Sequence, residues 1–186
     1  MTPDERLARL VADEAAGTLP GFVHFWSHEP RAAHPGPWVL SQWWEAPFEV
    51  DGVRYATAEA FLMAGKARTF GDEDALAEIL AATHPGVAKD AGRRVTPYDD
   101  AVWAGVRYDV AVRGNLTKFS SRDDLRAYLL STAPKVLVEA SPVDPVWGIG
   151  LAANDPAAER PSEWRGTNLL GFALMDVRER LAAGTR

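Results

Sequence analysis

Apolar residues recur at helical spacing along most of the chain, and short apolar runs typical of strands are few. The first helix is predicted from a capping box of Thr2 and Glu5 around Pro3, and Gly17 can close it. The same periodicity predicts further helices over 58–69 after Thr57, from Asp72, over about 87–92, from Thr96-Pro97, from Ser121 and from within 164–171.

Three short segments carry strand patterns instead. Residues 21–26 predict a first strand, and residues 47–55 predict a hairpin, because alternating residues flank Asp51-Gly52. The apolar run 136–139 predicts a buried strand. In the helix expected from Thr96-Pro97, the predicted inward residues are Val102, Trp103, Val106 and Val110, and Gly114 is expected to loosen the last turns.

The stretch 136–150 is the most informative part of the chain. Its strand ends in Glu139 and is broken by two prolines, after which come Asp144, Trp147 and Gly148. A buried strand that runs into an acidic, Gly/Trp-containing loop can hold polar groups at the edge of a pocket. The alternative is an ordinary strand and turn with Trp147 in the core, which this stretch alone slightly favours.

A second acid and a base lie in the helix predicted over 58–69. Glu59 falls in its first turn, and Lys66 returns to nearly the same face two turns later. The residues between them, 61–65, are all apolar or small, so the helix should be largely buried. A buried acid and base need a partner or a purpose, and a solvated pair on a surface is the alternative of equal weight.

Composition restricts the function. At 186 residues, 47% hydrophobic and 25% charged, the chain suits one soluble domain without a membrane-spanning run. A net charge of −6 argues against a broad nucleic-acid binder. The absence of cysteine excludes thiolate metal sites and cysteine nucleophiles, and His24 and His28 lack a third ligand, so neither a metal site nor a cofactor is expected. The acidic start is unlike a signal peptide, and we expect a cytoplasmic protein.

Phosphate-binding features are weak in the sequence itself. The spacing of Gly166 and Gly171 suggests a P-loop, but Phe172-Ala173 stands where Lys-Ser/Thr is required. Two features remain: the adjacent arginines Arg93-Arg94 in an expected loop, and the helix start around Asn168, whose N–H groups can face a phosphate. Adjacent arginines are more often simply solvated.

The order of several motifs resembles the NADAR family, also called YbiA-like or DUF1768, from about Phe22 to Leu181. The strongest matches are Leu137-Val138-Glu139 with Asp144-x-x-Trp147-Gly148-x-Gly150, and Gly166-x-Asn168-x-Leu170-Gly171-x-x-Leu174-Met175-x-x-Arg178. Supporting matches are Phe25-Trp26-Ser27, Thr57-Ala58-Glu59, Lys66, Gly92-Arg93, Trp103 and Lys118-Phe119. The chain departs from the family at Ser41-Gln42-Trp43, where Ser-Asn-Phe is frequent, and at Glu59-Ala60, where Glu-His is frequent; both differences can alter substrate fit.

This resemblance implies a compact single domain that is mainly α with a few short β-strands. We expect residues 1–20 to form an appended helical arm and residues 21–186 to form the family domain. The resemblance also implies an N-glycosidase, a hydrolase that cleaves a base–ribose bond. Members of the family are similar to enzymes that act on riboflavin-pathway intermediates, and others remove ADP-ribose from modified guanine bases, so the resemblance implies a substrate of one of these kinds.

The resemblance implies roles for the residues already singled out. Cleavage of an N-glycosidic bond builds an oxocarbenium-like ribose, which a carboxylate stabilises while a base activates water. The expected catalytic acids are Glu59 and Asp144, with Glu139 as a third candidate. Lys66 is expected to act electrostatically, or as an amine that forms a Schiff base at C1′.

The expected substrate contacts are aromatic side chains for the base and basic or N–H groups for phosphates. They comprise Phe25, Trp26, Arg93, Trp103, Lys118, Trp147, Gly148 and Asn168. The expected partner is a small nucleotide-like molecule of the ADP-ribose or ribosylaminopyrimidine phosphate type, or ADP-ribosylated guanine in nucleic acid. Two other classes stay open: a module that binds ADP-ribose without cleaving it, and an interaction protein whose acids form structural ion pairs.

Overall fold

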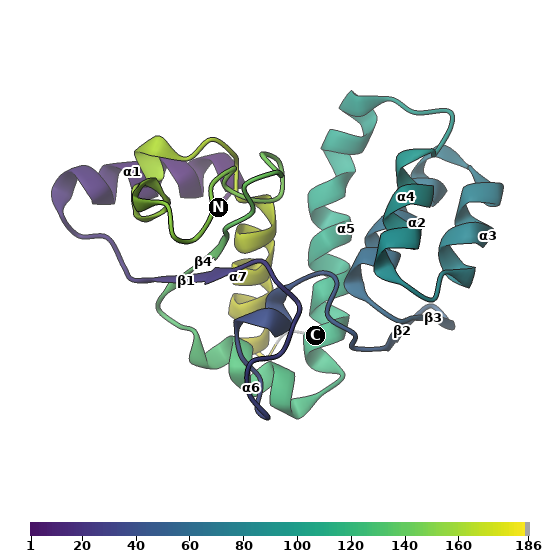
Figure 1. The fold of residues 1–186 in the computed structure, drawn as a ribbon, viewed down its shortest axis with the longest axis horizontal. Coiled ribbons are helices and arrows are strands. Elements are labelled where there is room, and N and C mark those ends of the chain that lie inside the picture. Colours follow the sequence, from purple (N-terminus) through teal and green to yellow (C-terminus); the bar gives the residue numbers. More distant parts are fainter. Residues whose placement is uncertain (185–186) are drawn as a thin grey trace. The chain divides into compact units, whose positions relative to one another are not determined.

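The computed structural model describes residues 1–184, which divide into two compact units (Figure 1). One unit comprises residues 1–41 and 124–186, and the other comprises residues 42–123. The last two residues of the predicted family domain, 185–186, lie outside the described part of the chain. Helices dominate both units and strands are few and short, which confirms the predicted fold class. No helix within residues 1–184 is long and apolar enough to span a bilayer.

The first unit is built on a pair of parallel strands. Strand β1 (Phe22–Phe25) pairs with β4 (Val136–Glu139), so that Phe25 lies opposite Glu139 at the carboxyl end of both strands. Helix α7 (Leu169–Ala182) packs on β4. The remaining elements of this unit are α1 (Pro3–Ala16), α6 (Asp123–Ser131, within the unit from residue 124) and the 3-10 turns η1 (Pro37–Leu40), η2 (Pro156–Glu159) and η3 (Pro161–Glu163).

Helix α1 forms as the capping box predicts, and it does not stand alone within its unit. The Thr2 hydroxyl accepts from the Glu5 N–H, the Glu5 carboxylate accepts from the Thr2 N–H, and Gly17 closes the helix at φ 68°. Arg6 pairs with Asp176 and Glu179 of α7, and Glu14 accepts from Ser162 in η3. The segment predicted as an arm is therefore tied to α7 and η3.

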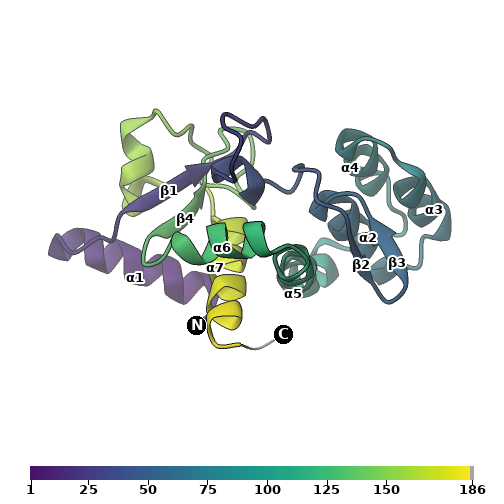
Figure 2. The same ribbon diagram turned by 90° about the horizontal axis from the view of Figure 1, so that it is seen from below.

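The second unit is a small helical bundle with one hairpin. The hairpin strands β2 (Phe48–Val50) and β3 (Val53–Tyr55) meet at Asp51 and Gly52, which both have positive φ as an Asp-Gly turn requires. Figure 2 shows α2 beside α3 and α4, which also contact each other. The helices of this unit are α2 (Ala58–Phe70), α3 (Glu73–Ala81), α4 (Pro85–Arg93) and α5 (Asp100–Ser120).

Helix α5 differs from its prediction in three ways. It begins at Asp100 rather than near Thr96-Pro97, because the Asp99 side chain accepts from the Val102 N–H and caps the helix there. Val102 was expected inside but is 48% exposed, since the later start places it in the first turn. Gly114 does not loosen the helix, which continues unbroken to Ser120.

The real role of Gly114 is close packing between α5 and α2. A Cβ on Gly114 would lie 2.5 Å from Cδ1 of Phe61, and a Cβ on Gly65 of α2 would lie 2.5 Å from Cγ1 of Val110. Each helix therefore offers a glycine to a large side chain of the other. The two contacts fix an antiparallel register in which Phe61 lies level with Gly114, and Gly65 lies level with Val110.

This packing predicts a stability difference between two alanine variants of α5. Gly114→Ala should destabilise the fold by about 1–3 kcal/mol relative to Gly105→Ala, because the added methyl collides with Phe61. Gly105 lies in the same helix with nothing within 4 Å of its Cβ position, so both variants gain the same helix propensity of up to about 1 kcal/mol. Urea unfolding measures the difference, and equal stability of the two variants would contradict the packing.

Candidate active site

Glu59 is buried at the beginning of α2. The Thr57 side chain caps the helix by accepting from the Ala60 N–H at 3.2 Å, as predicted. Glu59 follows in the first turn and is only 5% exposed. Its backbone N–H lies too early in the helix for an intrahelical partner and donates instead to the carbonyl of Gln42 at 3.0 Å. The first turn of α2 is thus held from outside the helix.

Lys118 lies on the side of α5 that faces this helix start. Val110 and Gly114, four residues apart, contact α2, and Lys118 continues the same row by one more turn. Because α2 runs antiparallel to α5, that turn is level with the beginning of α2. Lys118 is completely buried, and this burial lowers the pKa of its amine from 10.5 to about 7.

An amide pair joins the beginning of α2 to α5. The Gln42 side chain donates from Nε2 to Oδ1 of Asn115 at 3.0 Å, and Asn115 donates from Nδ2 to Oε1 of Gln42 at 3.3 Å. Asn115 also donates to the carbonyl of Ala111 one turn earlier. Asn115 is fully buried and Gln42 is 7% exposed. Gln42, Glu59, Asn115 and Lys118 therefore form a buried polar cluster at one end of the α2–α5 contact.

Lys66 has contacts of its own at the other end of α2. Its Nζ donates to the carbonyl of Gly92 at 2.8 Å and lies 4.2 Å from the centre of the Tyr98 ring. Burial lowers the pKa of Lys66, and Asp100 opposes the shift. A carbonyl and an aromatic face both favour the ammonium form. Lys66 is thus only partly buried, whereas Lys118 is fully buried and is the lysine whose pKa falls to about 7.

Trp103 and Arg93, two predicted substrate contacts of this unit, differ in their exposure to solvent. Trp103 is 6% exposed and belongs to the core. Arg93 is the last residue of α4 rather than part of a loop, and its Nη1 donates to Asp90 at 3.1 Å in an exposed pair. The neighbouring Arg94 pairs with Glu78. Each arginine thus has its own carboxylate partner.

In the other unit, Asn168 holds the end of β4. Its Oδ1 accepts from the N–H of Glu139 at 2.9 Å, and its Nδ2 donates to the carbonyl of Leu137 at 2.9 Å. Asn168 is fully buried and adopts φ 52°, in the left-handed region that asparagine tolerates. Gly171 packs one turn later, where a Cβ would lie 2.1 Å from the Leu137 carbonyl oxygen. These contacts fix where Glu139 lies.

The loop after β4 is closed by Asp144 and covers the start of α7. Oδ1 of Asp144 accepts from the N–H groups of Val146 and Trp147 at 3.0 and 2.8 Å. Gly148 is required here, since a Cβ would lie 2.7 Å from the Glu139 carbonyl oxygen. The N–H groups of residues 167–170 donate to carbonyls of the loop residues Pro145, Gly148, Val146 and Trp147. The N–H groups expected to face a phosphate thus have protein partners.

The two aromatic residues at the end of β1 differ in exposure. Phe25 is 4% exposed and is part of the core, whereas Trp26 is 52% exposed. Trp147 is half-buried in the loop after β4. Within this unit, Trp26 and Trp147 therefore present surface to a ligand and Phe25 does not.

The structure thus groups the predicted site residues by unit. Glu59 and Lys118 share one cluster, with Gln42 and Asn115, which sequence reasoning missed. Glu139, Asp144, Trp147, Gly148 and Asn168 share the other arrangement, at the end of β4. The missed pair had one signal: Asn115 is an amide three residues before Lys118 in a helix that buries both. Gln42 was noted only as part of the departure from the family motif at Ser41-Gln42-Trp43, without a role.

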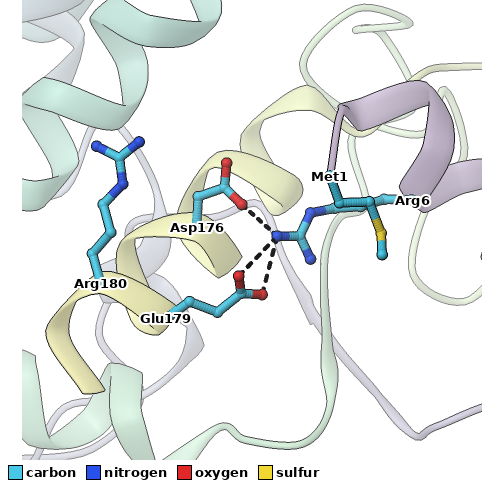
Figure 3. A pocket seen from close by; sticks show the side chains of 5 residues that line it. All are labelled: Met1, Arg6, Asp176, Glu179 and Arg180. Atoms are coloured by element: carbon cyan, nitrogen blue, oxygen red, sulfur yellow. Dashed lines mark hydrogen bonds and ion pairs between the residues drawn. The ribbon is translucent and has the colours of Figure 1, made fainter. Parts of the chain in front are cut away.

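A hollow elsewhere in the first unit is lined by none of these residues. It has a volume of about 320 Å³ and lies where α1 meets α7 (Figure 3). Arg6 reaches across it to Asp176 and to Glu179, whose carboxylate oxygens lie 3.0 and 3.1 Å from the same nitrogen. The two carboxylates raise the pKa of Arg6 against the opposing effect of burial. Three of its lining residues, Arg6, Asp176 and Glu179, already pair with one another and tie α1 to α7.

Comparison with known proteins assigns the family. Residues 24–182 match the NADAR domain. N-glycosidase R617 of Acanthamoeba polyphaga mimivirus is 37% identical over 157 residues, which cover 82% of this chain and 92% of the relative. N-glycosidase YbiA of Escherichia coli strain K12 is 35% identical over 136 residues, covering 73% and 76%. The NMR structure of E. coli YbiA superimposes with a TM-score of 0.71 at 30% identity, covering 89% of this chain and 88% of that one.

The chain belongs to the NADAR family, as its motifs predicted. The match begins at residue 24 and ends at residue 182, close to the range Phe22 to Leu181 expected from the motifs. The likeness to YbiA also confirms the expected mainly helical fold. The roles of the individual site residues remain predictions.

The buried amine of Lys118 predicts how stability depends on pH. The pKa is about 7 in the folded protein and higher in the unfolded chain, so between the two values the unfolded chain binds more protons. The free energy of unfolding should therefore rise with pH above about 7, by roughly 1 kcal/mol per pH unit from this group. Below that pH the amine is protonated in both states and its contribution is constant.

Lys118→Met isolates this effect, since it keeps an unbranched side chain without a titrating group. Stability of the wild type relative to this variant, measured by urea unfolding from about pH 6 to about pH 9, should increase. Lys135→Met, at an exposed lysine, is the matched control, and the difference from wild type should change more with pH for Lys118→Met than for Lys135→Met. If the stability difference between wild type and Lys118→Met did not change with pH, the pKa of Lys118 would not be lowered in the folded protein.

Proposed function

We propose that this protein is an N-glycosidase that hydrolyses the base–ribose bond of a nucleotide-like substrate, with Glu59 as its principal catalytic group. The observation that carries this proposal is the burial of the Glu59 carboxyl group at a helix N-terminus whose first turn is fixed by Gln42. Relatives in the same family that carry the name N-glycosidase support the reaction class.

Hydrolysis of the N-glycosidic bond needs a correctly positioned carboxylate and a water molecule. As the bond from ribose C1′ to the base nitrogen breaks, its electron pair leaves with the base and positive charge develops on the ribose. A carboxylate beside C1′ stabilises that charge, or accepts a proton from the water whose oxygen bonds to C1′. The departing base takes up a proton. We assign the carboxylate role first to Glu59, then to Asp144 and Glu139.

Asp144 and Glu139 differ in the hydrogen bonds that they make within the protein. One oxygen of Asp144 accepts two backbone N–H groups, which holds the carboxylate in one orientation and leaves its second oxygen for a substrate. Glu139 is positioned through its backbone by Asn168. For Lys66 we propose the electrostatic role, because the Gly92 carbonyl and the Tyr98 ring favour an ammonium over a nucleophilic amine.

The remaining predicted contacts belong to substrate binding. Trp26 and Trp147 have exposed surface on which a base can stack. Exposed Arg93 can turn from Asp90 to a phosphate. Gly148 and Asn168 shape the loop that presents Trp147, whereas Phe25, Trp103 and Lys118 act from the interior. We propose ADP-ribose-type or ribosylaminopyrimidine phosphate substrates, ADP-ribosylated guanine among them, and a cytoplasmic location.

Replacement of Glu59 tests the catalytic assignment. Glu59→Gln keeps the shape of the side chain but removes its charge, so turnover should fall roughly a hundredfold or more, the usual scale for a general acid or base. Release of free base from ribosylaminopyrimidine phosphates, NAD and ADP-ribosylated guanine oligonucleotides, followed by liquid chromatography, measures the effect.

Glu49→Gln is the matched control, because it removes an exposed carboxylate from β2 in the same unit. It should leave turnover within twofold of wild type, about the scatter of such assays. Near-normal turnover in Glu59→Gln would remove Glu59 from the mechanism. A wild-type protein that binds these compounds, as measured by thermal shift, but releases no base from any of them would identify a binding module instead.

A further inference from the structure

The amide pair of Gln42 and Asn115 has a consequence for Glu59 that neither residue shows alone. Gln42 contacts the beginning of α2 through its backbone and α5 through its side chain. Asn115 is in turn fixed within α5, because Nδ2 also donates to the carbonyl of Ala111 at 2.9 Å. Gln42 therefore links α5 to the N–H of Glu59: its side chain is hydrogen-bonded to Asn115, and its backbone carbonyl accepts from Glu59.

We propose that Asn115 is a positioning residue that acts through Gln42 to fix the first turn of α2, and with it the carboxyl group of Glu59. The inference rests on the proposed function, in which Glu59 acts at the ribose. A helix start is otherwise prone to fraying, since its first N–H groups lack intrahelical partners. The Gln42 carbonyl gives the Glu59 N–H its partner.

Side-chain length makes the pair specific to this combination. Gln42 is one methylene longer than asparagine, and its amide meets the shorter amide of Asn115 in both directions, at 3.0 and 3.3 Å. Both side chains are buried, so neither amide can turn to solvent for a replacement partner. Shortening one partner should therefore be repaired by lengthening the other.

Amide hydrogen exchange reports on this clamp without any substrate. The Glu59 N–H depends on the Gln42 carbonyl, whereas the next N–H, that of Ala60, depends on the Thr57 hydroxyl of the same helix. Asn115→Leu, which keeps a similar volume but removes the amide, should make the Glu59 N–H exchange at least tenfold faster and leave Ala60 unchanged. Thr57→Ala should do the reverse.

Turnover should follow the same pattern. Asn115→Leu and Gln42→Asn should each lower kcat by about tenfold to a hundredfold, with KM changed much less, because a displaced carboxylate loses transition-state contact more than substrate binding. The double variant Gln42→Asn with Asn115→Gln restores the combined length and should recover most of kcat and the slow Glu59 exchange. If Asn115 only stabilised the fold, the single variants would melt at a lower temperature. Their kcat, measured at a temperature where all variants are folded, would then stay near normal and leave nothing for the double variant to rescue.

Two results would overturn the proposal: a Glu59 N–H that stays protected in both single variants, or normal kcat in a variant whose Glu59 N–H has become exposed. If Asn115→Leu does not fold, Gln42→Asn with its compensating double variant carries the same test. Glu59→Gln in the same assay keeps the two hypotheses apart. Normal turnover there would reject the role of Glu59, and the exchange data would still decide whether the clamp exists.

Discussion

The close packing of α2 on α5 is the constraint on which the candidate site depends. Gly65 and Gly114 let the two helices approach until Val110 and Phe61 fill the space that a Cβ would occupy. Once that register is set, the next turn brings Lys118 level with the beginning of α2, where Glu59 is also buried. The fold thereby forces charged groups into a region where each must be neutralised or hydrogen-bonded, which is costly for stability and useful for chemistry.

The other unit solves a similar problem with backbone contacts rather than helix packing. The Asn168 side chain accepts a hydrogen bond from the N–H of Glu139 and donates one to the carbonyl of Leu137 in β4. At Gly148 and Gly171, carbonyl oxygens approach so closely that any Cβ would collide with them. The spacing of Gly166 and Gly171 thus reflects close approach of chain segments, not a phosphate-binding loop. Asp144 has a related double use, because one of its oxygens closes the loop that carries Trp147. These residues shape a rigid edge at the end of a strand.

Local signals were enough to predict most of the helices and strands. Capping by Thr2, Thr57 and Asp72, and the Asp51-Gly52 turn, depend on neighbours a few residues away, so the sequence specifies them directly. Features that depend on contacts between distant residues could not be predicted from the sequence. Whether Thr96 or Asp99 starts α5 depends on competing caps, and the role of Gly114 depends on Phe61, far away in the chain. The partnership of Gln42 with Asn115 spans 73 residues and leaves no periodic trace.

In the proposed mechanism, the buried carboxyl group of Glu59 lies beside the ribose of the substrate. The most direct measurement is the structure of the Glu59→Gln variant bound to an uncleaved substrate. We expect the side chain at position 59 to contact the ribose, either directly or through one water positioned for attack on C1′. A ribose that lies against Asp144 or Glu139, with position 59 out of contact with both sugar and water, would contradict it.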